Sequence, residues 1–178
     1  MMDAIETFEV NGKTVEIHLD DNPESPREWD NLGEILYTSH RYVLGDRRVD
    51  SEEITKTLAR KDVVSLPVYA YIHSGTCLNT TGYSCPWDSG QSGIIFVTKE
   101  QIRKEYSCKI VTKKIREKVL SVLRSEVETY SQFCEGQVYG YQIKEKDGEE
   151  TDSCWGFFGL EYCKAEATQV ANYEPKTA

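Results

Sequence analysis

The sequence predicts an α+β protein with a mostly antiparallel sheet, built from two hairpins plus central strands, with helices packed on one side. The pairs Asn11-Gly12 and Asp147-Gly148 each separate stretches of alternating apolar and polar residues, which is typical of hairpins. β-Branched and aromatic runs lie between the two hairpins, and apolar residues recur at helical spacing over 112–135. Hairpins join antiparallel neighbours, so we expect few parallel strand pairs.

The bulk composition predicts one domain over residues 1–178, in which the N-terminal hairpin at 4–19 can form a small lobe. The 178 residues are 39% hydrophobic, which is enough for a buried core. No apolar run approaches the length of a bilayer span, and the acidic N-terminus is unlike a signal peptide. We therefore expect a cytoplasmic protein with no membrane partner. None of the six cysteines forms a C-x-x-C pair, which favours reduced thiols over a zinc ribbon.

The segments after the first hairpin alternate between loops and short elements. Residues 20–31 contain two prolines and several acids, so we expect an exposed loop there. Residues 32–46 fit a helical turn and a strand equally well. Asp50 and Glu53 have the spacing of an N-terminal cap, which predicts a short helix over 51–61.

The middle of the chain predicts strands around a long loop. Residues 63–73 are β-branched and aromatic, and Pro67 within them indicates an edge strand or a bulge. The polar, glycine-bearing residues 74–93 are expected to form a twenty-residue loop, and long ordered loops are often functional. The apolar residues 94–97 then predict a buried strand.

Three further helices are predicted from their terminal residues. Thr98 and Gln101 cap a short helix over 99–106. Thr112 begins a long helix that runs to Glu135 and ends at Gly136. Residues 159–173 are expected to close the chain as a helix.

The long helix contains one residue that does not fit its apolar stripe. At 100° per residue, Glu126 lies within that stripe, where an unpaired carboxylate is costly. Either Glu126 is a structural residue bound to an arginine or to backbone amides, or it is a site residue at the bottom of a cleft. The stripe itself comprises Ile115, Val119, Val122, Leu123, Val127, Tyr130, Phe133 and Cys134.

Charge is distributed unevenly along the chain, whose net charge is −9. Residues 99–124 hold nine Lys or Arg against three Glu, whereas residues 1–30 and 126–152 are strongly acidic. Solvated faces that keep the protein soluble would explain this pattern. The functional alternative is a polarised surface, with an acidic face that binds a basic partner and a basic helix that binds phosphate. The nucleic-acid-binding residues predicted on that basis are Lys104, Lys109, Lys113, Lys114 and Lys118.

The sequence contains no recognisable catalytic motif, so we expect no catalytic residue, resident metal or cofactor. His73, Cys85 and Asp88 can be combined into a nucleophile–base arrangement, as can many loops of this composition. The loop at 20–31 offers oxygen ligands of the kind that Mg²⁺ or Ca²⁺ prefers, but without EF-hand spacing. These carboxylates are Asp20, Asp21, Glu24, Glu28 and Asp30.

All three tryptophans lie near aspartates at the boundaries of predicted elements. Tryptophans in polar settings are typical of protein-recognition hot spots, which predicts one face built from three loops. The alternative is three loops folded onto the sheet, with their indole N–H groups bonded to neighbouring oxygens. The predicted partner-binding residues are Trp29, Asp30, Trp87, Asp88, Gln91, Asp152 and Trp155.

These clusters resemble a known group of proteins. The segments 24–33, 66–75, 84–106, 126–143 and 152–159 (ESPREWDNLG, LPVYAYIHSG, SCPWDSGQSGIIFVTKEQIRKEY, EVETYSQFCEGQVYGYQI and DSCWGFFG) resemble small acidic proteins encoded by phages and mobile elements of gut Firmicutes. The resemblance covers residues 13–165 and extends to the type II-A anti-CRISPR proteins, which disable Cas9. It implies binding to Cas9 in the bacterial host cytoplasm. The binding site on Cas9 would be the surface with which Cas9 grips DNA or guide RNA. It identifies no catalytic residue in this chain.

Three hypotheses follow. The preferred one is a non-enzymatic anti-defence protein that inhibits a nucleic-acid-guided nuclease such as Cas9. The alternative is a metal-dependent hydrolase acting on guide RNA, with Glu126, His73 and Asp88 as its catalytic residues and Mg²⁺ bound by carboxylates. A plain interaction module with another host target is the third, and the oligomeric state stays open in all of them.

Overall fold

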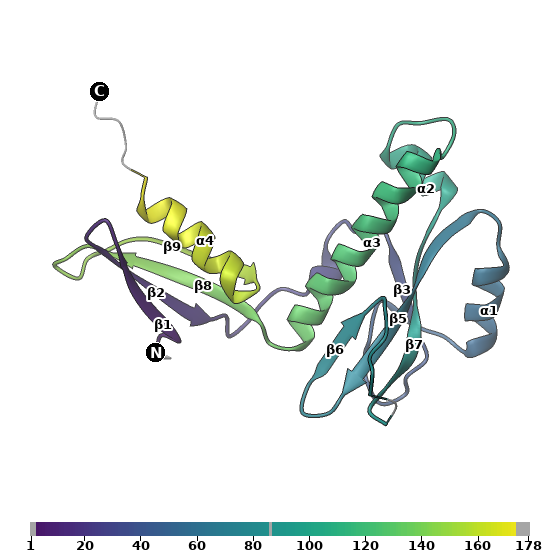
Figure 1. Cartoon of the computed structure of the whole chain (residues 1–178), viewed down its shortest axis with the longest axis horizontal. Helices are drawn as coiled ribbons and strands as arrows, with labels where there is room; N and C mark the ends of the chain where they lie inside the picture. The colour runs from purple at the N-terminus through teal and green to yellow at the C-terminus, as the bar shows by residue number, and fades with distance from the viewer. Residues whose placement is uncertain (1–2, 86, 174–178) are drawn as a thin grey trace. The chain divides into compact units, whose positions relative to one another are not determined.

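The computed structural model describes residues 3–85 and 87–173 and has the predicted α+β fold (Figure 1). The described residues form four α-helices and nine strands. All strand pairs among them are antiparallel except the short pair of β3 (Glu34–Tyr37) with β4 (Arg47–Arg48). The mostly antiparallel character expected from the hairpins is therefore confirmed.

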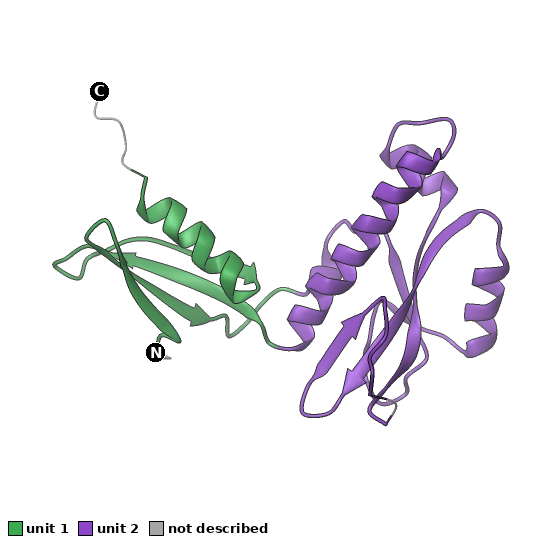
Figure 2. Ribbon diagram, viewed as in Figure 1, with its two compact units in different colours: residues 1–24, 136–178 green, residues 25–135 purple. Residues whose placement is uncertain are grey.

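The chain divides into two compact units, shown in different colours in Figure 2. Residues 1–24 and 136–178 form one, which we name the terminal unit, and residues 25–135 form the other, the central unit. The sequence predicted one domain with the hairpin at 4–19 as a small lobe. In the structure that hairpin belongs to the same unit as the C-terminal residues.

The terminal unit is a four-stranded antiparallel sheet with one helix. Both predicted hairpins are confirmed, and their strands are adjacent in the order β1-β2-β8-β9. Asn11 and Gly12 have φ values of 51° and 77°, as a type I′ turn requires. The elements are β1 (Glu6–Val10), β2 (Lys13–Leu19), β8 (Val138–Lys144), β9 (Glu150–Phe158) and α4 (Leu160–Ala171).

The core of the terminal unit lies between its sheet and α4. Cys163, Ala167 and Ala171 recur every four residues on α4 and are fully buried. Their small side chains allow the helix backbone to approach the sheet closely. They pack against alternate residues of the two central strands, namely Val15, Ile17, Tyr141 and Ile143.

The central unit contains a five-stranded sheet in the order β4-β3-β7-β5-β6. Residues 74–93, predicted as a single loop, include a strand and the beginning of the next, so that prediction is wrong in extent. The strands were missed because their polar side chains give no apolar pattern. Only Leu78 of the first of these strands is buried. The remaining strands are β5 (Val63–Ile72), β6 (Thr76–Asn79) and β7 (Ser89–Thr98).

Pro67 marks an irregular position in an internal strand. β5 lies between β7 and β6 in the sheet order, but β6 pairs only with residues 69–72, so at Pro67 the strand is paired on the β7 side alone. The predicted bulge is present, because the register of β5 with β7 shifts between Val68 and Tyr69. Proline lacks the N–H that a regular ladder needs, and the register shift follows directly after it.

The predicted helix caps are confirmed. The Asp50 side chain accepts a bond from the backbone N–H of Glu53 at 2.8 Å, and Thr98 and Gln101 form a reciprocal capping box. Thr112 caps the long helix, and Gly136 follows it with a φ of +70°. The helices are η1 (Pro26–Glu28, a 3₁₀ turn), α1 (Ser51–Ala59), α2 (Lys99–Glu105) and α3 (Lys113–Cys134).

The two faces of the central sheet are covered by different helices (Figure 1). α3 packs on the face that contains Ile35, Val68 and Ile95. We expected all helices on one side, but Ile54 of α1 packs against Phe96 and its apolar neighbours on the other face. That face also carries buried side chains, which need a cover of their own. No helix in the described part of the chain is long and apolar enough to cross a bilayer.

The first prediction concerns the contact between Gly140 and Trp155 in the terminal unit. A Cβ at position 140 would overlap the Trp155 ring, which lies over this glycine on the neighbouring strand. Gly140→Ala should therefore lower the free energy of unfolding by about 1–3 kcal/mol, measured by urea denaturation. Gly90→Ala is the matched control, because the space around Gly90 is open. Equal stability of the two variants would contradict the close contact.

Candidate functional site

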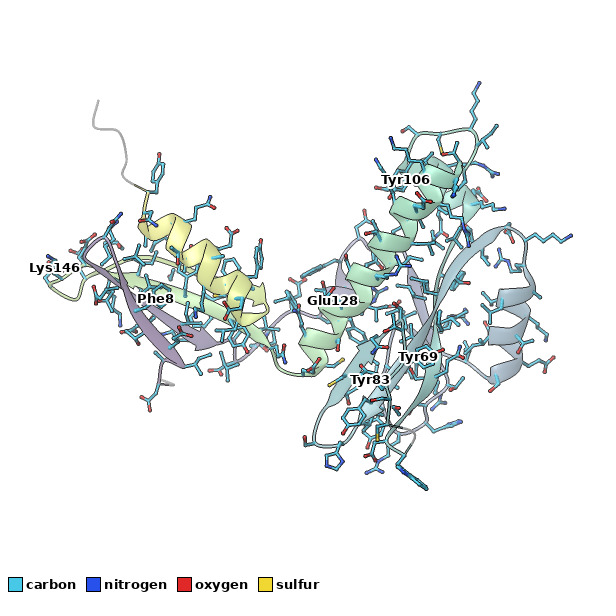
Figure 3. The ribbon with its side chains drawn as sticks, in the orientation of Figure 1. Phe8, Tyr69, Tyr83, Tyr106, Glu128 and Lys146 are labelled. Atoms are coloured by element: carbon cyan, nitrogen blue, oxygen red, sulfur yellow. The ribbon has the colours of Figure 1, made fainter. Side chains whose placement is uncertain are left out.

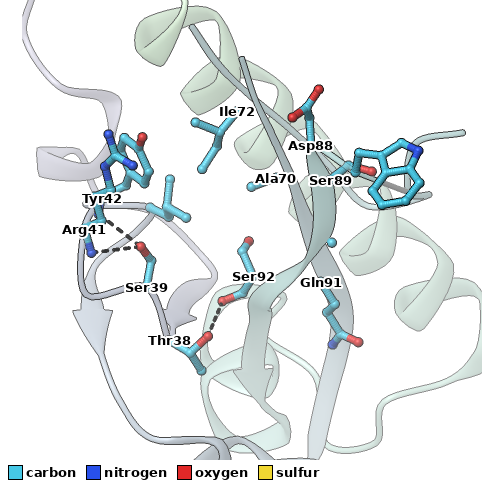
Figure 4. Close-up of a pocket in the computed structure, with 13 residues that line it drawn as sticks. Thr38, Ser39, Arg41, Tyr42, Ala70, Ile72, Asp88, Ser89, Gln91 and Ser92 are labelled. Atoms are coloured by element: carbon cyan, nitrogen blue, oxygen red, sulfur yellow. Dashed lines mark hydrogen bonds between the residues drawn. The ribbon is translucent and has the colours of Figure 1, made fainter. Parts of the chain in front are cut away.

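An open hollow of about 400 Å³ lies on the central unit where β5 and β7 meet the segment 38–44 (Figure 4). It contains three residues predicted from the sequence to bind a partner: Trp87, Asp88 and Gln91. We name it the Trp87 hollow. Its other lining residues are Thr38, Ser39, Arg41, Tyr42, Leu44, Ala70, Ile72, Ser89, Gly90 and Ser92.

Trp87 is an exposed side chain on a strand-anchored turn. Its side chain is 91% exposed, so the alternative in which it is folded onto the sheet is wrong. The turn is fixed by its backbone: Ile72 N–H donates to the Asp88 carbonyl at 3.0 Å, and the Ser89 hydroxyl donates to the Cys85 carbonyl. An exposed indole on a fixed backbone is suited to contact with another molecule, since little conformational entropy is lost on binding.

The side chain of Asp88 is directed to a histidine. Its Oδ2 lies 3.6 Å from Nδ1 of His73, whose ring stacks on Tyr71 with centroids 6.4 Å apart. Tyr71 in turn contacts the ring of Tyr83. Burial raises the pKa of Tyr83 to about 12, so its phenol stays neutral at physiological pH. Asp88 therefore connects the hollow to a run of aromatic rings, of which Tyr71 and Tyr83 are not part of its lining.

The opposite wall is formed by the segment 38–44. The guanidinium of Arg41 lies 5.2 Å from the centre of the Tyr42 ring. Ser39 Oγ accepts hydrogen bonds from the backbone N–H groups of Arg41 and Tyr42. Thr38 donates to the carbonyl of Ser92 at 3.2 Å, which fixes this segment to β7 (Figure 4). The hollow therefore combines an aromatic residue and both signs of charge on a fixed frame, as recognition surfaces do.

Glu126 is bound by an arginine and by backbone amides. This geometry is the one expected of Glu126 as a structural residue. Its Oε2 accepts from Arg27 Nη1 at 3.2 Å, and its Oε1 accepts from the backbone N–H of Leu32 at 2.8 Å. The N–H of Gly33 lies within 3.3 Å of both oxygens. Glu126 is therefore engaged by the 27–33 segment, and the structure does not bring it together with His73 and Asp88.

Arg27 also binds a second carboxylate. Its Nε and Nη2 donate to the two oxygens of Asp46 at 2.9 and 2.7 Å, and Nη2 also donates to the carbonyl of Gly33. Burial would lower the pKa of Arg27, but the carboxylates of Asp46 and Glu126 more than offset this, so its pKa is raised. We name these three residues the Arg27 network. Sequence reasoning predicted that Glu126 needs a partner but missed Arg27 and Asp46.

The acids at 20–31, considered above as possible oxygen ligands, do not form a cluster. Among the described residues, no group of three or more His, Cys, Asp or Glu side chains could hold a metal ion. The acids of the 20–31 segment are divided between the units, since Asp20, Asp21 and Glu24 belong to the terminal unit and Glu28 and Asp30 to the central unit. Asp20 accepts a bond from the backbone N–H of Asn22 at 3.0 Å, as a turn residue does.

The predicted nucleic-acid-binding lysines lie on α2, on α3 and on the loop between them. All five are exposed, and three neighbouring arginines are exposed with them. None of these eight side chains has an ion pair within the residues that the structure describes. We name them the basic strip: Arg103, Lys104, Lys109, Lys113, Lys114, Arg116, Lys118 and Arg124.

The terminal unit is acidic. It contains 15 acidic and 5 basic residues, a net charge of −10, against 15 and 16 in the central unit. Asp152 and Trp155 are exposed on β9, where Trp155 packs over Gly140 and beside the ring of His18 at 6.1 Å. Trp29 and Trp87 belong to the central unit, where they line different hollows. The single face of three tryptophans stays a prediction.

No family model, curated protein or solved structure matches the chain. The functional argument therefore depends on the surfaces described above. These are an exposed tryptophan hollow and a basic strip on the central unit, and an acidic surface on the terminal unit.

The second prediction tests the Arg27 network. Arg27→Met leaves two partly buried carboxylates without their counter-charge, so it should lower the free energy of unfolding by about 3–5 kcal/mol. Arg116→Met is the matched control, because Arg116 is exposed and its substitution should cost less than about 0.5 kcal/mol. Urea denaturation measures both. A loss below about 1 kcal/mol for Arg27→Met would show that the network does not hold the unit together.

The third prediction concerns the acid range. Lys144 donates to Glu16 at 2.7 Å, and this bond holds the pKa of Glu16 below its ordinary value. Because the folded-state pKa is lowered, Glu16 stabilises the fold at pH values above its unfolded-state pKa of about 4.3. This contribution is lost as the pH falls through the folded-state pKa. Lys144→Met should therefore reduce stability at pH 7 and flatten the decline between about pH 5 and 3. An unchanged pH profile of unfolding would contradict this.

Proposed function

We propose that the protein is a non-enzymatic anti-defence protein that binds and inhibits a bacterial nucleic-acid-guided nuclease of the Cas9 type. The observation that supports this best is the separation of charge between an acidic terminal unit and the unpaired basic strip of the described central unit. Nucleases of this type line their nucleic-acid channels with lysine and arginine. An acidic surface competes with the nucleic acid for these side chains. The basic strip then binds phosphates of the guide RNA in the same complex.

The turn between β8 and β9 is the most acidic part of the terminal unit. Lys146 lies at its tip (Figure 3), but carboxylates outnumber the lysines around it. The residues 147–152 are all exposed, so their charges are presented to solvent in a row along a hairpin. A row of carboxylates resembles a phosphate backbone in charge, which gives it affinity for a basic channel. These carboxylates are Glu145, Asp147, Glu149, Glu150 and Asp152.

The alternative, a metal-dependent hydrolase acting on guide RNA, has less support. It needs Glu126 to share a site with His73 and Asp88, and Glu126 is bound by Arg27 and two backbone amides instead. Incubating guide RNA with the protein, in Mg²⁺ or in EDTA, tests this on a denaturing gel. Cleavage that depends on Mg²⁺ would replace the proposed function with the hydrolase.

A cleavage assay tests the proposal directly. Cas9 with its guide RNA should cleave target DNA more slowly in excess protein, and the effect should differ when the guide is bound first. A variant in which the five carboxylates of the β8–β9 turn become amides should inhibit less. The matched control replaces Glu52 and Glu128, which are exposed carboxylates of the central unit, with Gln. Cleavage at an unchanged rate in large excess of the wild-type protein would overturn the proposal.

The fourth prediction assigns Trp87 to the interface with this partner. Trp87→Ala should weaken binding by at least about 30-fold, as truncation of a hot-spot residue does, while thermal stability stays unchanged. Asp88→Asn should weaken binding more at low salt than at high salt, because a charged contact is screened. Binding measured by calorimetry, with melting curves for both variants, checks this. Normal binding by both variants would show that the hollow is not the interface.

A further inference from the structure

A second groove lies along α3 in the central unit, apart from the Trp87 hollow. It consists of two hollows of about 460 and 240 Å³, both lined by Asn31, Val122 and Glu126. The two hollows adjoin at these three residues, and together they make one groove along α3 and the segment 29–32. We name it the α3 groove.

Aromatic and apolar side chains line the two parts of the groove. Trp29 is 46% exposed and lines one hollow, and Tyr106, at the end of α2 beside α3 (Figure 3), lines the other. Val122 lies between them and is 36% exposed, which is unusual for an apolar residue in the stripe of α3. Two flat aromatic side chains along one open channel are suited to stacking on planar ligands.

Hydroxyl groups line one side of this groove, and two lysines extend their row along α3. Lys114 and Lys118 are one turn apart on α3 and lie outside the lining of both hollows, but at helical spacing they extend the row of hydroxyl residues toward the start of the helix. Both lysines are exposed, and neither has an ion pair among the described residues. Lys104 lines the opposite wall. The hydroxyl residues are Ser121, Ser125 and Thr129.

The acids of the groove leave the α3 side positive. Glu126 is neutralised by Arg27, so it does not repel an anion as a free carboxylate would. Asp30 and Glu105 line only the hollow that contains Tyr106. Phosphate groups are therefore favoured along the row of Lys114 and Lys118 and disfavoured beside these two acids.

We propose that the α3 groove binds a single-stranded nucleic acid, with bases stacked on Trp29 and Tyr106 and phosphates bound by Lys114 and Lys118. Only an unpaired strand can place its bases on side chains in a channel of this size, because a duplex keeps them stacked on each other. Aromatic platforms beside a positively charged track are the usual construction of such sites. The inference rests on the proposed function in one respect, since it identifies the single-stranded part of the guide RNA as the natural ligand.

Fluorescence anisotropy with a labelled 12-nucleotide single-stranded RNA and its duplex form tests this site. The wild-type protein should bind the single strand more tightly than the duplex. Trp29→Ala should weaken that binding by about 10-fold, and Trp29→Phe, which keeps a stacking ring, should retain most of it. The double variant Lys114→Gln/Lys118→Gln should reduce the slope of log affinity against log salt by about 1.4. The controls are Tyr173→Ala, which removes an exposed aromatic ring of the terminal unit, and Lys56→Gln/Lys61→Gln; all three residues lie outside the groove.

Several results would overturn the inference. Absence of binding to the single strand at low salt is one, and tighter binding of the duplex is another. Equal affinity of wild type and a Trp29→Ala variant with an unchanged melting temperature is a third. Displacement of the RNA by an acidic peptide at equal affinity would identify a peptide groove instead. A wild-type protein that inhibits Cas9 but does not bind the single strand counts against this site alone, whereas one that binds the single strand but does not inhibit Cas9 counts against the proposed function alone.

Discussion

The central unit depends on a buried arginine that holds two carboxylates. The Arg27 side chain is 8% exposed and is bound by Asp46 on one side and Glu126 on the other. Removing charges from water costs several kcal/mol per ion, so such a network stabilises the fold only when each member has its partners. Gly33 is part of this requirement, because a Cβ there would overlap Leu123 of α3 and keep its N–H from Glu126.

This network positions both candidate surfaces of the central unit. The segment 27–33, held by Arg27 and Glu126, carries Trp29 and forms one wall of the α3 groove. Asp46 accepts a bond from the backbone N–H of Ile35 at 2.6 Å and thereby anchors the end of the segment that lines the Trp87 hollow. Binding residues on loops are effective only when a rigid frame holds them, and here one guanidinium contributes to both frames.

Local signals predicted most of the elements, and long-range contacts decided what they missed. The Asn11-Gly12 turn and the caps at Asp50, Thr98 and Thr112 lie within a few residues of what they stabilise. The apolar stripe predicted that Glu126 needs a partner, but Arg27 is 99 residues away and nothing local distinguishes it from other arginines. β6 was missed for a similar reason, because it is stabilised by β5 and α3 rather than by its own polar residues.

The ion pairs among the described residues of the central unit do not include its basic strip. Arg27, Arg47 and Arg60 each bind acids of their own unit. These pairs engage Glu34, Asp46, Glu53, Asp62 and Glu126, and the eight cations of the strip are without an ion pair among the described residues. α3 has no acid in its first turn, where carboxylates would favour the helix dipole, and Lys113 and Lys114 stand there instead. These lysines lower the stability of the helix and concentrate positive charge on its surface. Such a surface favours binding of a polyanion more than it favours the stability of the isolated fold.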